Sequence, residues 1–323
     1  MHKPVLLNEV LKYLNPRPGG VFIDATINGG GHAQAIAERI GSAGKLLGID
    51  RDCEIIKSRS LRSAINAISC TLICDSFKNI KTIAEHKGFT NADGILFDLG
   101  FSSFHIEESG RGFSFKTDEP LDMRYNRAEG ISAAELINSI SEDELRSLLY
   151  TLGEERYARN IARSIVRERA VHAIERAHEL VVVIEKSVPP RYRYSRIHCA
   201  TRTFQALRMR VNDELDHVAE GIRGAVALLR TGGPVRTRPN PSERKFVRAD
   251  RNSSGRTGTR PGGRIAVITF HSGEDRLIKQ IFRDFEHSSS ITRITKRVVR
   301  PAEEERSENP RARSAKLRVA EKI

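Results

Sequence analysis

Short β-rich runs and helical stretches alternate through the first hundred residues, and this order constrains the fold more than any other feature. The runs 21–23 and 95–97 are apolar on consecutive residues, which is typical of strands buried on both faces. Strand and helix in regular order predict a parallel sheet with right-handed crossovers, a doubly wound α/β domain. We expect strands at 21–25, 45–49, 71–74 and 94–99, and helices at 32–40, 52–63 and 76–86.

Beyond residue 99 this alternation stops and later returns. Helical periodicity covers 132–149, 154–183 and 201–229, and Ser141 with Glu144 has the pattern of a capping box. A strand at 264–270, a helix at 274–285 and β-like segments at 291–295 and 316–320 resume the α/β pattern. We therefore expect a discontinuous α/β domain of residues 1–105 and 210–323, interrupted by a helical domain of residues 106–209.

The 323 residues carry a formal net charge of +13, with a sequence pI of about 9.8. An excess of this size favours a polyanionic partner, because Lys and Arg displace counterions from phosphates. The apolar runs are far shorter than the roughly 20 residues that span a bilayer. The first residues also lack the apolar region of a signal peptide. We expect no membrane segment and a cytoplasmic protein.

A basic, low-complexity segment runs from about residue 231 to 260. It holds too few large apolar residues to bury a core, so we expect a mobile basic loop or linker inserted in the α/β domain. It is either a surface loop without function or an additional arm that contacts RNA.

The four cysteines are Cys53, Cys70, Cys74 and Cys199. Cys70 and Cys74 resemble half of a zinc site, but no second Cys or His pair stands at ligand spacing. We therefore expect no bound metal and four reduced, unpaired thiols, as is usual in a reducing cytosol.

Polar and glycine residues follow the ends of the expected strands. Three glycines at 29–31 follow the first strand, where the backbone can approach a ligand and helix-start amides can face an anion. They match neither the phosphate loop nor the dinucleotide fingerprint. Asp50 ends the second strand, where a carboxylate can bind ribose hydroxyls. Phe77 and Asp98 follow the third and fourth strands, so the pattern predicts a nucleoside-type cofactor.

The stretch from His198 to Arg208 offers a possible nucleic-acid surface. Arg202, Gln205 and Arg208 are spaced at single helical turns and can share one helix face. Such a face suits contacts with phosphates and base edges. The alternative interpretation is a solvated polar face above an apolar stripe.

Several motifs, in their order along the chain, carry a family resemblance. They are RGFSF at 111–115, PLDMR at 120–124, ATRTFQA at 200–206, TFHS at 269–272 and ENPRARSAKLR at 308–318. With the strand-end pattern, they closely resemble the MraW/RsmH family of bacterial and organellar 16S ribosomal RNA cytosine-N4 methyltransferases. The resemblance covers almost the whole chain.

That resemblance implies a Rossmann-like class I methyltransferase domain, S-adenosylmethionine as the cofactor and a helical domain that recognises RNA. The implied reaction is methylation of the exocyclic N4 amine of one cytidine in the decoding region of 16S rRNA, within the small ribosomal subunit. The implied cofactor contacts are Gly30, Gly31, His32, Asp50, Phe77, Asp98 and His105, the last standing where the family commonly has Gln. The implied RNA contacts are Arg111, His198, Arg202, Gln205 and Arg208.

Asp98 and Ser102 are the candidate catalytic residues. We expect Asp98, with backbone or hydroxyl groups of residues 99–103, to orient the amine of a cytidine splayed out of its strand. The sequence leaves open whether Asp98 serves the cofactor, the amine or both.

Two other functions compete with this one. A DNA cytosine-N4 or adenine-N6 methyltransferase usually carries a Pro-Pro-aromatic signature, which is absent after Phe97. A non-catalytic RNA-binding protein that retains the cofactor fold is the other. The oligomeric state stays open, including a homodimer, as does the choice between free rRNA and an assembled subunit.

Overall fold

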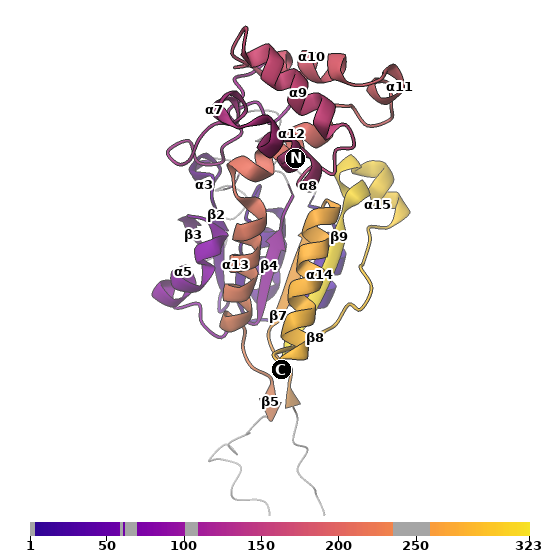
Figure 1. Cartoon of the computed structure of the whole chain (residues 1–323). Helices are drawn as coiled ribbons and strands as arrows, with labels where there is room; N and C mark the ends of the chain where they lie inside the picture. The colour runs from indigo at the N-terminus through magenta and orange to yellow at the C-terminus, as the bar shows by residue number, and fades with distance from the viewer. Residues whose placement is uncertain (1–3, 59–60, 62–69, 101–108, 235–258) are drawn as a thin grey trace, which may run out of the picture.

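The computed structural model describes residues 4–58, 61, 70–100, 109–234 and 259–323. Its centre is a seven-stranded sheet with the order β3-β2-β1-β4-β7-β9-β8 (Figure 1). The parallel strands are β1 (Val21–Asp24), β2 (Lys45–Asp50), β3 (Cys70–Cys74), β4 (Gly94–Asp98) and β7 (Arg264–Thr269). Strand β9 (Lys316–Lys322) runs antiparallel to β7 and to β8 (Ile291–Arg293). The predicted α/β sheet is confirmed.

Helices cover both faces of this sheet. Alternate strand residues point to opposite sides, so each face carries apolar side chains that need to be buried. Phe22 and Ile23 of β1 accordingly belong to two different buried clusters. The cluster around Phe22 packs against α1 (Leu7–Leu14), α2 (Gly31–Ile40) and α3 (Cys53–Lys57). The cluster around Ile23 packs against α5 (Ile80–Lys87), α13 (Glu214–Leu228) and α14 (Ser272–His287). The shorter elements are η1 (Phe77–Asn79), α15 (Glu303–Glu308) and η3 (Pro310–Ser314).

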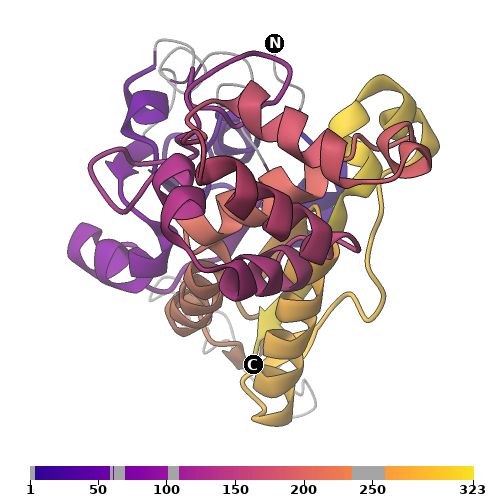
Figure 2. The same cartoon turned by 45° about the horizontal axis from the view of Figure 1, so that its top comes forward.

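A third buried cluster lies within a bundle of helices that stands at one end of the sheet (Figures 1 and 2). The bundle comprises α7 (Ala133–Ser139), α8 (Glu142–Thr151), α9 (Ala158–Arg169), α10 (Ala177–Ser187), α11 (Pro190–Arg193) and α12 (Thr201–Val211). The predicted capping box is present at the start of α8, where the Glu144 N–H donates to Ser141 Oγ. Figure 2 shows the bundle lying across the carboxyl ends of the parallel strands.

Two expected long helices are each divided. The segment 154–183 forms α9 and the start of α10, and the segment 201–229 forms α12 and α13. Asp213 between the latter pair has a φ of 47°. The break has a physical cause at Asn212, whose side-chain amide donates to Met123 O at 2.7 Å and whose Oδ1 accepts from Tyr125 N at 2.9 Å. These contacts tie the chain to a distant loop, so the helix ends there.

The expectation of four unpaired thiols is wrong, because Cys53 and Cys74 form a disulfide. Their Cα atoms lie 5.2 Å apart. Cys74 ends β3 and Cys53 follows β2, and these neighbouring parallel strands place the two side chains together. Cys70 and Cys199 are free thiols.

The basic segment begins and ends in a short antiparallel ribbon of β5 (Gly233–Pro234) and β6 (Thr259–Arg260). Residues 235–258 between them lie outside the described part of the chain. No helix among the described residues is long and apolar enough to cross a membrane.

Candidate active site

A cavity lies at the carboxyl ends of β1, β2 and β4, where open α/β sheets bind ligands. Its lining includes Asp50, Phe77 and Asp98, three of the predicted cofactor contacts. We call it the cofactor cavity. The parallel register explains why residues so far apart in sequence meet here: Asp50 pairs with Cys74 of β3, and Asp98 pairs with Ile268 of β7.

Asp50 is held rigidly at the end of β2. Its Oδ2 accepts from the Asn28 N–H at 3.0 Å, and its Oδ1 accepts from the Asp52 N–H at 2.9 Å. Each carboxylate oxygen can accept further hydrogen bonds, so the pair of ribose hydroxyls of a nucleoside fits this group.

Phe77 offers the cofactor cavity an aromatic ring. The ring packs edge-on against Phe97, with centroids 5.6 Å apart. It also packs closely against α13, since a Cβ added at Gly221 would lie 2.8 Å from Phe77 Cδ2. A ring fixed in this way can pack against the adenine of a bound cofactor.

Gly30 and Gly31 shape the turn that enters α2. Gly30 has a φ of 79°, a conformation that favours glycine, and a Cβ at Gly31 would meet Pro4 Cγ at 3.0 Å. His32 is 6% exposed, with its Nε2 at 3.0 Å from Val5 O and its Nδ1 at 3.6 Å from Asp98 Oδ2. The structure thus places His32 beside the Asp98 carboxylate.

The Asp24 carboxyl is buried near the Asp50 and Asp98 carboxyls that line this cavity. Burial raises the pKa of Asp24 to about 7, and the charges of Asp98 and Asp50 add to the effect. Asp98 is 7% exposed, and its Oδ1 accepts from the Gly100 N–H at 3.2 Å. A Cβ at Gly100 would lie 3.0 Å from that oxygen and 2.6 Å from Phe270 Cε2, so the close approach requires glycine here.

A second cavity adjoins the first, and the two share Asn28, Asp98, Leu99, Gly100 and Glu274 in their linings. Two of the predicted RNA contacts, Gln205 and Arg208 of α12, line this second cavity. The other side chains that line it include His271 at the start of α14 and Arg311 of η3. Carboxylate side chains therefore lie between the cofactor cavity and a second cavity that is also lined by cationic side chains.

His271, Glu274 and Arg311 are site residues that the sequence reasoning did not assign. They lie in or beside the motifs at 269–272 and 308–318. A usable signal existed for the first two, because they follow a parallel strand just as Asp98 does. Strand β7 pairs directly with β4.

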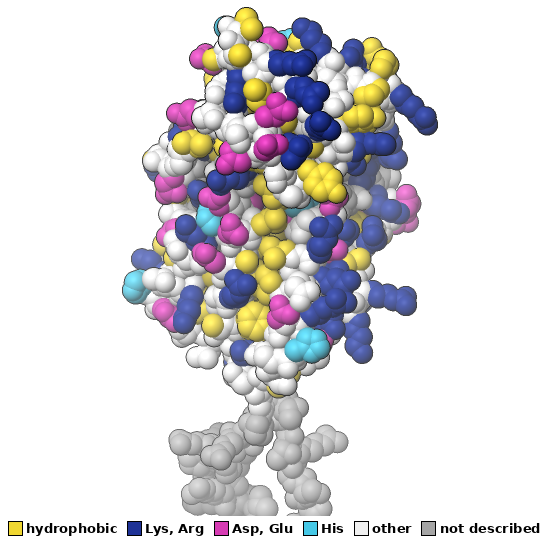
Figure 3. All heavy atoms as spheres, viewed as in Figure 1, with side chains coloured by type: hydrophobic (Ala, Val, Ile, Leu, Met, Phe, Trp, Pro, Cys, Tyr) yellow, Lys and Arg dark blue, Asp and Glu magenta, His cyan; other side chains and the backbone are white. Residues whose placement is uncertain are grey.

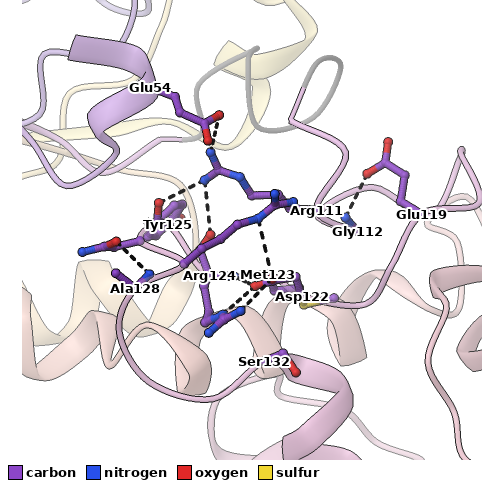
Figure 4. Close-up of polar contacts among 12 residues, drawn as sticks. Glu54, Arg111, Gly112, Glu119, Asp122, Met123, Arg124, Tyr125, Ala128 and Ser132 are labelled. Atoms are coloured by element: carbon purple, nitrogen blue, oxygen red, sulfur yellow. Dashed lines mark hydrogen bonds and ion pairs between the residues drawn. The ribbon is translucent and has the colours of Figure 1, made fainter. Parts of the chain in front are cut away.

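Arg111 is the clearest correction among the predicted RNA contacts (Figure 4). It is 1% exposed, and its guanidinium contacts Asp52 Oδ2 at 2.8 Å, Glu54 Oε2 at 2.7 Å and Tyr125 O at 3.0 Å. The predicted RNA contact is wrong because the side chain is enclosed between α3 and the loop at 122–125. There it binds the segment after β2 to the segment before the helical bundle.

The remaining predicted residues lie elsewhere. His198 stacks on Phe115 with ring centroids 4.7 Å apart, and Arg202 Nη1 donates to Glu154 O at 3.0 Å. Neither lines the second cavity. Ser102 and His105 lie outside the described residues, so their roles remain predictions.

Comparison with known proteins identifies the family. The model of the MraW methylase family matches residues 1–237 and 254–323. The protein named "Ribosomal RNA small subunit methyltransferase H" from Dictyoglomus thermophilum is 40% identical over 323 residues, covering 100% of this chain and 97% of the relative. The protein of the same name from Brevibacillus brevis is 38% identical over 337 residues, covering 100% of this chain and 98% of the relative. The one from Geobacter sulfurreducens is 39% identical over 337 residues, covering 100% of this chain and 99% of the relative. The unmatched residues fall within the basic segment. This chain belongs to the MraW methylase family.

Proposed function

We propose that this protein methylates the N4 amine of a cytidine in the decoding region of 16S rRNA, with S-adenosylmethionine as the methyl donor. The observation that carries the proposal is the wall between the two cavities, where Asp98 and Glu274 face both. Membership of the MraW methylase family and the names of its full-length relatives support rRNA of the small subunit as the substrate.

The cofactor cavity fits the adenosyl group by the chemistry of its lining. Asp50 would accept from the ribose hydroxyls, and Phe77 would pack against the adenine. When bound, S-adenosylmethionine supplies an electrophilic methyl carbon, and the electron pair of its carbon–sulfur bond stays on sulfur. Asp98 lines both this cavity and the second one.

The acceptor needs help from the protein, because the lone pair of the cytosine amine is delocalised into the ring. Carboxylate oxygens that accept hydrogen bonds from the amine increase its electron density and fix its direction. Orientation of this kind supplies much of the rate in a methyl transfer. Asp98 ends β4, and the hydrogen bond that it accepts from the Gly100 N–H restrains its carboxylate, which supports this role.

We further infer that residues 106–209 recognise RNA and that residues 1–105 and 210–323 perform the transfer. The helical bundle has its own buried core, and its last helix brings Gln205 and Arg208 to the second cavity. Lys and Arg side chains gather over the bundle and beside α14 (Figure 3), where Arg276, Lys279 and Arg283 are exposed. Such surfaces favour a phosphate backbone. The partner is the small ribosomal subunit, in the cytoplasm.

Transfer of label from S-adenosylmethionine tests the substrate. The protein is incubated with small ribosomal subunits that lack the modification, with their free 16S rRNA and with DNA. We expect label in RNA and none in DNA, and Asp98→Ala should abolish it. The variant Glu85→Ala, at an exposed position of α5 outside the helical bundle, is the control and should label like the wild type. Label in DNA alone, or no label at all, would contradict the proposal.

A further inference from the structure

His271 and Glu274 begin α14 on the wall of the second cavity, and no role has yet been assigned to them. Helix α14 follows β7, which pairs with β4, so the start of this helix lies beside Asp98. Glu274 is 3% exposed and lines both cavities, whereas His271 lines only the second. Both side chains therefore meet whatever enters that space.

Backbone hydrogen bonds fix the orientation of both side chains. The Glu274 N–H donates to His271 Nδ1 at 3.3 Å, and Glu274 Oε2 accepts from the Phe270 N–H at 2.9 Å and the His271 N–H at 3.3 Å. Because Nδ1 accepts a hydrogen bond, the neutral imidazole carries its proton on Nε2. His271 Nε2 is thus a donor, and Glu274 Oε1 is an acceptor.

These two atoms lie 3.0 Å apart. His271 Nε2 is buried, yet it has no aligned hydrogen-bond partner within the described part of the chain. A buried donor without an acceptor is costly unless a ligand satisfies it. The donor and the acceptor thus lie side by side in two residues that line the second cavity, and the donor still lacks an aligned acceptor.

We propose that His271 and Glu274 read the Watson–Crick edge of the target cytosine. Glu274 Oε1 accepts from the N4 amine, and His271 Nε2–H donates to ring nitrogen N3. Uracil presents an oxygen at position 4 and an N–H at position 3, so both contacts are reversed and it is rejected. Reading of an unpaired base on this edge is typical of RNA recognition. The inference rests on the proposed function and adds the residues that choose the base.

A metal ion fits the His271–Glu274 pair less well than a base does. Glu214 completes a group of three possible ligands with His271 and Glu274, all within 4.8 Å of one another. However, Arg208 already contacts both oxygens of Glu214, at 2.7 Å and 2.8 Å. Burial alone would lower the pKa of Arg208, but Glu214, Tyr125 and Glu274 raise it overall, so the guanidinium stays charged. Both Glu214 oxygens are therefore already engaged, which leaves a metal ion only His271 and Glu274 as ligands and favours a neutral base at this pair.

Glu274 also accounts for the proton that the reaction releases. The amine nitrogen uses its lone pair to bond the methyl carbon, while the leaving pair remains on sulfur. The nitrogen then gives up one N–H proton and keeps the electron pair of that bond. Glu274 Oε1, which already accepts from this amine, takes the proton.

Binding of base analogues by the full-length protein, without a methyl donor, tests the inference. The probes are short single-stranded oligoribonucleotides with one central cytidine, 3-deazacytidine or uridine, followed by fluorescence anisotropy. The 3-deaza base keeps the amine and lacks the N3 acceptor. We expect the wild type to bind the cytidine probe about tenfold more tightly than either analogue. Equal affinity for all three probes would overturn the inference.

The variants assign each contact. His271→Ser keeps a residue that caps a helix and removes the ring donor, so it should bind cytidine and 3-deazacytidine equally. Glu274→Gln retains an oxygen for the backbone amides, and it should lose discrimination against uridine. Gln280→Ala, exposed on the same helix, should behave like the wild type. Wild-type discrimination in both site variants would contradict the assignment, and thermal melting reports whether they fold.

The two proposals fail separately. A wild-type protein that labels 16S rRNA but does not discriminate among the probes retains the proposed function and loses this inference. A wild-type protein that labels no RNA loses the proposed function itself.

Discussion

Arg111 Nη1 lies 2.8 Å from Asp52 Oδ2, and each of the two side chains is 2% exposed. This buried ion pair joins the segment that carries Asp50 to the loop that precedes the helical bundle. The same guanidinium contacts the carbonyl oxygens of Arg124 and Tyr125. The RGFSF motif at 111–115 therefore acts through structure, by holding the edge of the cofactor cavity against the bundle.

Arg111→Ala should lower the free energy of unfolding by about 3–5 kcal/mol, because it leaves Asp52 buried without its partner. Urea denaturation measures the change. Arg146→Ala removes one member of an exposed pair with Asp143 on α8 and should cost about 0–1 kcal/mol. Equal stability losses in the two variants would show that burial of the Arg111 pair contributes nothing.

Reduction of the Cys53–Cys74 disulfide should lower the free energy of unfolding by about 3 kcal/mol, because the closed loop restricts the unfolded chain. Cys53→Ser should reproduce this loss, and Cys70→Ser, at a free thiol, serves as its control. Thiol titration of the unfolded, unreduced protein should find two reactive groups, and four after reduction. Four groups before reduction would exclude the disulfide.

Asp24 should make stability fall as pH rises from 4 to 7. Its folded-state pKa of about 7 lies above the ordinary value of 3.8, so the folded protein holds a proton that the unfolded chain has released in this range. The slope from this group is about 1.4 kcal/mol per pH unit and vanishes above pH 7. Asp24→Asn should remove that slope. Denaturation curves at several pH values measure it, and parallel profiles for the two proteins would refute a raised pKa.

Asp50→Ala should weaken S-adenosylmethionine binding by about 10- to 100-fold, since a hydrogen bond to a charged group contributes about 1.5–3 kcal/mol. Isothermal titration calorimetry measures the dissociation constant directly. Glu129→Ala is the matched control, because its carboxylate is 61% exposed and pairs with Arg51 near the same cavity. An unchanged affinity in Asp50→Ala would remove this residue from the cofactor site.

The strand-end residues were predictable because parallel strands bring their carboxyl ends to one edge. Asp50, Phe77 and Asp98 line one cavity for that reason. The helix α1 could also have been found, since Val10, Leu11 and Leu14 recur at helical spacing and are buried. These features depend on local periodicity and on strand order.

Features that depend on distant partners were not predictable in the same way. The burial of Arg111 follows from Asp52, which lies 59 residues earlier in the chain. The break between α12 and α13 follows from contacts of Asn212 with residues 123 and 125. His271 and Glu274 join the site only because β7 pairs with β4 across a long insertion. Local sequence carries no signal for the contacts of Arg111 and Asn212, whereas the position of His271 and Glu274 after a parallel strand was a usable signal.

Nucleoside mass spectrometry of 16S rRNA tests the central proposal most directly. Small subunits that lack the modification are treated with the protein and S-adenosylmethionine, and the rRNA is digested and mapped. We predict N4-methylcytidine at one position in the decoding region, with none formed by Asp98→Ala. A methyl group on another atom or another base, or unmodified rRNA after treatment with the folded protein, would contradict it.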